Sequence, residues 1–72
     1  MKIFVFINTI ANYCSGNFYF VAEDKRHASQ IAGDFAFNHN AKINYNRNYT
    51  IEWDFNNITE YEIKPGYLPL NR

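Results

Sequence analysis

The sequence predicts an α+β domain with the element order β-β-α-β-β, in which a small antiparallel sheet carries one helix packed on one face. Four stretches of aromatic and β-branched residues have the length and alternation of strands. One stretch between the second and third of them has the apolar spacing of an amphipathic helix. The 72 residues leave room for a single domain, residues 1–72, with a thin core.

The first two expected strands are residues 3–7 and 18–22, joined by a long polar connection. The run Ile3-Phe4-Val5-Phe6-Ile7 is apolar at every position, which is typical of a strand covered on both faces. We therefore expect residues 3–7 to lie in the interior of the sheet.

The expected helix follows Asp24, a residue type that favours the N-cap position. Its apolar positions recur at i, i+3, i+4 and i+7 and form one stripe: Ala28, Ile31, Ala32 and Phe35. The pattern fades by residues 38–40, and the asparagine-rich stretch 38–48 is predicted to be a loop, with or without an added short strand.

Residues 49–63 predict a hairpin, because two segments alternate with period two on either side of Asn56-Asn57. A two-residue turn there would place Trp53 opposite Glu60 and mix a buried face with a charged one. A three-residue loop at 56–58 instead pairs Trp53 with Tyr61, so we expect this register.

In that register four carboxylates lie on the outward face, with Asp54 opposite Glu60 and Glu52 opposite Glu62. Like charges directly across a ladder are destabilising, so a sheet that keeps them is a candidate acidic patch for a basic partner. The alternative is a solvated outer face softened by lysine or arginine from nearby segments, which is the commoner role of charge runs.

Catalytic and metal-binding signatures are not found in the sequence. Cys14 is the only cysteine, and neither His27 nor His39 has a spacing that predicts a base for it. The outward carboxylates lack a cleft that would separate their pKa values, and the glycines are scattered. We expect a non-enzymatic protein with no catalytic residues, no metal and no cofactor.

A second function class comes from residues 42–49, where aromatic and basic residues alternate. Lys42, Tyr45 and Arg47 could bind single-stranded nucleic acid by stacking and charge. The formal net charge of zero gives no general attraction to nucleic acid, so this is the alternative reading. No stretch reaches transmembrane length, and the first apolar run is too short for a signal peptide, so we expect a cytoplasmic protein with no membrane partner.

The short single domain, the hairpin leading through Val21-Ala22-Glu23-Asp24 into a helix, the asparagine-rich composition and the acidic hairpin resemble small anti-defence proteins of phages and mobile elements, including anti-CRISPR proteins. This resemblance implies an inhibitor of a host defence or nucleic-acid-handling protein, acting in the host cytoplasm. The acidic face would occupy a groove built for phosphates on a basic host protein. The resemblance transfers no individual functional residue.

A homodimer is a further hypothesis about partners. It is prompted by the first strand, which is apolar on both faces, and by the apolar tail Tyr67-Leu68-Pro69-Leu70, which could cover a sheet face or dock on a partner.

Overall fold

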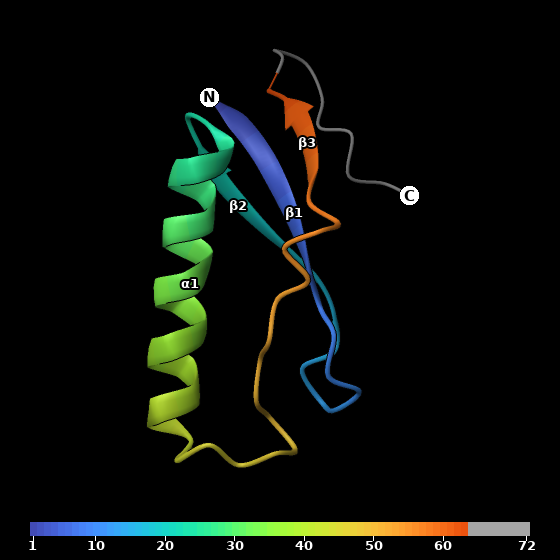
Figure 1. The fold of residues 1–72 in the computed structure, drawn as a ribbon, viewed down its shortest axis with the longest axis vertical. Helices are drawn as coiled ribbons and strands as arrows, with labels where there is room; N and C mark the ends of the chain where they lie inside the picture. The colour runs from blue at the N-terminus through green and yellow to red at the C-terminus, as the bar shows by residue number, and fades with distance from the viewer. Residues whose placement is uncertain (64–72) are drawn as a thin grey trace.

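The computed structural model describes residues 1–63 and contains three strands and one helix there. In chain order the elements are β1 (Lys2–Asn8), β2 (Gly16–Ala22), α1 (Lys25–Lys42) and β3 (Thr59–Glu62). The sheet order is β2-β1-β3, and both neighbours run antiparallel to β1 (Figure 1). The predicted α+β class and the interior position of the first strand are confirmed. The apolar tail at 67–70 lies outside the described residues.

The β1–β2 hairpin has an unbroken register. Each residue of β1 has one partner in β2, from Lys2 opposite Ala22 to Asn8 opposite Gly16. Gly16 begins β2 with φ of 123°, a left-handed conformation that side-chain-bearing residues rarely adopt. This glycine therefore allows the chain to turn from the 9–15 loop into the second strand.

The core lies between α1 and one face of the sheet. Phe4 and Phe6 of β1 are fully buried there, and the helix presents alanines at i, i+4 and i+8: Ala28, Ala32 and Ala36. The predicted stripe is confirmed at Ala28 and Ala32, but Phe35 is 42% exposed because the buried face of the helix is turned toward Ala36. Small side chains on this face let the helix lie close to the sheet.

The helix begins where the sequence predicts and ends later. The Asp24 carboxylate accepts a hydrogen bond from the His27 amide at 2.8 Å, which confirms the N-cap. The prediction of a loop over 38–48 is wrong for residues 38–42, which are helical. Side chains in this last part of α1 bind the chain that follows: Asn40 bonds both the N–H and the C=O of Ile51. Tertiary contacts thus outweigh the weak helix propensity of asparagine.

The predicted hairpin over 49–63 is wrong. Residues 49–55 form only one bridge, Trp53 opposite Asn8, with backbone bonds from Thr9 N to Glu52 O (2.8 Å) and from Asp54 N to Ile7 O (2.9 Å). Segment 52–54 and β3 therefore follow one another along the same edge of β1 and do not pair with each other (Figure 1).

Along this edge, the chain from segment 52–54 to β3 contains more residues than the part of β1 that lies beside it. Trp53 lies opposite Asn8 and Thr59 opposite Val5, so three steps along β1 (8 − 5) correspond to six along the other segment (59 − 53). Three extra residues are accommodated in the turn before β3. Alternation correctly indicates a strand-like segment, but it carries no information about which strand is the partner.

Candidate functional site

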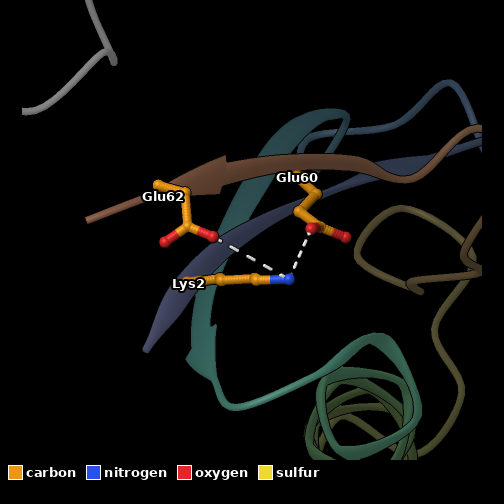
Figure 2. Close-up of polar contacts among 3 residues, drawn as sticks. All are labelled: Lys2, Glu60 and Glu62. Atoms are coloured by element: carbon orange, nitrogen blue, oxygen red, sulfur yellow. Dashed lines mark hydrogen bonds and ion pairs between the residues drawn. The ribbon is translucent and has the colours of Figure 1, made fainter. Parts of the chain in front are cut away.

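Two of the predicted carboxylates, Glu60 and Glu62, lie on β3, while Glu52 and Asp54 lie further along the same edge of the sheet, beside the other end of β1. Glu60 and Glu62 lie opposite Phe4 and Lys2 in the register, on the sheet face that also carries the helix. The helix packs over β2 and β1, so the two carboxylates lie beyond its cover. Figure 2 shows Lys2 between them, with its Nζ 2.8 Å from Glu60 Oε2 and 3.9 Å from Glu62 Oε1.

The charge pair changes the titration of Lys2. The hydrogen bond and the negative charge of Glu60 raise the pKa of the Lys2 ammonium above its usual value, and Glu62 and Asp24 add smaller contributions in the same direction. The sequence reading expected a lysine or arginine to soften this face but did not identify Lys2, which is 58 residues from Glu60 along the chain.

Asp54 and Glu52 do not face Glu60 and Glu62 across a ladder, so the predicted pairings are wrong. The Asp54 carboxylate closes a turn, accepting from the Asn56 amide at 3.0 Å and from Asn57 Nδ2 at 2.8 Å. The Glu52 amide donates to Asn8 Oδ1, the Glu52 carbonyl oxygen accepts from Thr9 N, and the Glu52 carboxylate is left exposed. We call Glu52, Glu60 and Glu62 the acidic edge; with Lys2 between two of them, it carries two net negative charges (1 − 3).

Exposed tyrosines form a second surface at the far end of the molecule, where the 9–15 and 43–50 loops meet. The Tyr13 amide donates to Asn48 O at 3.0 Å, and the rings of Tyr13 and Tyr49 lie 5.4 Å apart with an interplanar angle of 39°. We call Tyr13, Tyr45 and Tyr49, together with the exposed Lys42 and Arg47, the tyrosine end.

The charges of the tyrosine end are not neutralised locally. Within residues 1–63 neither Lys42 nor Arg47 forms an ion pair, since the ion pairs of this part of the chain involve Lys2 alone. Of the alternative site residues, Tyr45 is 56% exposed and has φ of 55°, at the left-handed turn that follows α1. The sequence reading missed Tyr13, because nothing local predicts its contact with Tyr49.

Asparagine side chains hold the 43–52 segment in place. Asn8 is buried and makes four hydrogen bonds: Nδ2 donates to Cys14 O and Thr50 O, while Oδ1 accepts from Ile10 N and Glu52 N. Asn12 donates to Thr50 O and to Arg47 O. These bonds replace a regular ladder along this stretch, and they fix the backbone beneath the tyrosine end.

Cys14 and His39 come together although their spacing does not predict it. Cys14 Sγ lies 3.9 Å from His39 Nε2, a contact that the positions of the two residues in the sequence did not predict. The same nitrogen lies 2.8 Å from the Tyr49 carbonyl oxygen, which can only accept, so Nε2 carries the proton. A protonated Nε2 cannot accept the thiol proton, so in this arrangement Nε2 does not act as a base toward Cys14.

Residues 1–63 contain no group of three or more histidine, cysteine, aspartate or glutamate side chains that could hold a metal ion. In the same residues, no helix has both the length and the apolar character needed to cross a bilayer.

Comparison with known proteins gives no match: no family model, no curated protein and no solved structure corresponds to this chain. The acidic edge and the tyrosine end therefore carry the functional argument by themselves.

Proposed function

We propose that this protein is a small non-enzymatic protein-binding module, an inhibitor of a host defence or nucleic-acid-handling protein in the host cytoplasm. It docks through the acidic edge on a basic surface of that partner. The observation that carries the proposal is the placement of Glu60 and Glu62 on an edge strand, oriented by Lys2 and left uncovered by the helix.

The role of Lys2 is to orient the carboxylates rather than to neutralise the edge. Its ammonium binds one oxygen of Glu60 at 2.8 Å, and the other oxygen remains available to a partner guanidinium. A glutamate that is already ordered loses less conformational entropy on binding. The excess negative charge attracts a cationic partner before contact, an effect that salt weakens.

The test is a double charge reversal that spares the Lys2–Glu60 bond. Glu52→Lys with Glu62→Lys reverses two carboxylates of the acidic edge, and Glu23→Lys with Asp34→Lys makes the same change in net charge at two exposed positions elsewhere. Each variant and the wild type are used as bait in host lysate, and retained proteins are identified by mass spectrometry.

The expected result is a basic protein retained by the wild type and by the Glu23/Asp34 control, eluted by salt, and lost with the Glu52/Glu62 variant. The purified partner should then bind the Glu52/Glu62 variant at least about tenfold more weakly, equivalent to ~1.4 kcal/mol. Equal retention by all three baits would remove the acidic edge from the proposal.

A second candidate function, binding of single-stranded nucleic acid, is favoured by one observation. Tyr13 and Tyr49 place two rings side by side at the tyrosine end, with Arg47 in the same loop. Bases stack on exposed aromatic rings whatever their sequence, and unpaired cations attract the phosphates.

The measurement for this candidate is fluorescence anisotropy of labelled single-stranded oligonucleotides. Tyr13→Ala should weaken binding by about 1–3 kcal/mol if one base stacks there. Tyr19→Ala removes an exposed tyrosine from β2 and should leave the affinity unchanged. Co-purification of RNA or DNA with the wild-type bait in the lysate experiment, without a retained protein, would favour this function over the first.

A further inference from the structure

The outer edge of β2 has none of the features that keep sheet edges from pairing. The strand contains seven residues, Gly16–Ala22, without a charged residue or a proline, and its register with β1 has no bulge. It lies at one margin of the sheet, and within residues 1–63 its only neighbouring strand is β1. Such an edge offers a row of backbone N–H and C=O groups to another strand.

The side chains of β2 leave this margin open on the face away from the helix. Phe18 and Phe20 point toward α1, where their rings lie 6.1 Å and 5.7 Å from the ring of Phe35. On the opposite face Tyr19 is 47% and Val21 is 53% exposed. These two side chains flank the margin and would extend an apolar surface across any strand added there.

We propose that a second copy of this chain pairs with β2, antiparallel and edge to edge, about a twofold axis at Tyr19. The two three-stranded sheets become one sheet of six strands with both helices on the same face. In this register Phe18 lies opposite Phe20 of the second copy, and Asn17 lies opposite Val21 of the second copy. Every cross-strand pair is uncharged, so none is repulsive.

A second copy fits better than an unrelated strand for two reasons. The twofold register matches β2 to itself, so the length, the absence of charge and the alternation agree by construction. The whole chain has zero formal net charge, so long-range repulsion does not oppose the approach of two copies.

The β3 edge cannot associate in the same way. It has four residues, and an antiparallel pairing centred on Tyr61 would set Glu60 opposite Glu62 of the second copy, like charge against like. Association is therefore confined to one edge, which gives a closed dimer rather than an open-ended sheet.

The experiment measures the solution mass of the full chain across a concentration series by sedimentation equilibrium. The wild type should rise from the monomer mass of 8.5 kDa to twice that value. Tyr19→Lys places two lysines opposite each other at the axis, and Tyr19→Glu two glutamates, so each variant should remain a monomer. An equimolar mixture of the two should return to the dimer mass, because opposite charges then face each other.

Thr59→Lys is the matched control, since Thr59 lies on the same sheet face as Tyr19 but on the other edge. It adds the same charge and should leave the dimer intact. Far-ultraviolet circular dichroism and the emission of the buried Trp53 establish that each variant is folded.

A wild type that stays at 8.5 kDa to high micromolar concentration overturns the proposal. Dissociation by Thr59→Lys to the same extent as by Tyr19→Lys, or failure of the mixed variants to restore the dimer, overturns it as well. The Glu52→Lys/Glu62→Lys variant should still dimerise, so loss of the host partner and loss of the dimer are separate results.

Discussion

The two edges of the sheet differ in how regularly they pair with β1, although both pair with it in the antiparallel sense. The β2 edge belongs to a local hairpin whose seven pairs form without interruption, and β2 itself has no charged side chain. The opposite edge consists of segment 52–54 and β3, separated by a turn and out of step by three residues. An irregular edge leaves backbone groups without ladder partners, and these groups must be satisfied in another way.

Asparagine side chains meet that requirement on the irregular side. Asn8, Asn12 and Asn40 bond to backbone groups between Arg47 and Glu52, including both groups of Ile51. These three asparagine side chains thus take the place of strand pairing along residues 47–52. The regular edge is left open for association, and the irregular edge carries the acidic residues.

The largest effect is expected where the irregular edge is anchored in the core. Trp53 is buried, donates from its indole N–H to Ala32 O at 2.7 Å, and packs against Phe6, Phe18 and Phe20. Trp53→Ala should lower the free energy of unfolding by about 3–5 kcal/mol.

Tyr19→Ala, at an exposed ring on the regular edge, should lower the free energy of unfolding by about 1 kcal/mol or less in the monomer. Urea unfolding followed by circular dichroism measures both changes. Similar losses for the two variants would show that the edges do not differ in how they are anchored.

The next effect is that of Asn8, whose side chain joins β1 to two different loops. Asn8→Ala removes four hydrogen bonds to part-buried backbone groups and should destabilise the protein by about 2–3 kcal/mol. Asn17→Ala, at an exposed position on β2, should change stability by less than about 0.5 kcal/mol. Chemical denaturation gives both values; a small loss at Asn8 would mean that water readily replaces its bonds.

The third prediction concerns the charges of β3, which keep this edge strand from pairing with another molecule. Glu60→Val with Glu62→Val removes the charges from β3 and leaves two uncharged edge strands per molecule, β2 and β3. Two open edges permit endless pairing, so light scattering should rise with time and concentration. Glu23→Val with Asp34→Val removes the same charge away from both edges and should not scatter. A Glu60/Glu62 variant that does not scatter would assign the protection to the interruption before β3.

The smallest effect concerns Lys2 and pH. Glu60 raises the pKa of Lys2 in the folded state, so the stabilisation is complete below the unfolded-state lysine pKa of about 10.4 and is lost as pH rises through the folded-state pKa. Lys2→Gln should therefore unfold slightly more easily than the wild type at neutral pH and low salt. The difference should vanish in strongly alkaline solution and shrink with added salt. A difference that persists at high pH would assign it to packing of the Lys2 stem.

Local signals in the sequence were enough for one half of the molecule. The apolar run 3–7, the aromatic run 18–22 and the N-cap at Asp24 each depend on residues a few positions apart, and each prediction is confirmed. The alternation in 49–55 is equally clear, yet its partner is β1, reached through Asn8 and Trp53. A period of two predicts that a segment has two different faces, but it does not predict which strand pairs with that segment.

The candidate surfaces were harder to predict from the sequence, because sequence patterns do not show which distant segments become neighbours. Lys2 meets Glu60, and Tyr13 meets Tyr49, only after the sheet order is set. One signal was present: Asn8 continues the parity of the buried Phe4 and Phe6, and a polar residue at a core-facing position requires several hydrogen-bond partners.

The long reach of Asn8 has a consequence for the order of folding. Its bonds to Thr50 and Glu52 span 42 and 44 residues, whereas β1, β2 and α1 are consecutive in the chain and contact one another. Local contacts form quickly and distant ones wait for loop closure, so the hairpin and helix assemble first and residues 50–62 dock last. During synthesis one side of the apolar β1 strand stays uncovered until residues 50–62 have left the ribosome, which makes β1 the segment most in need of protection from aggregation.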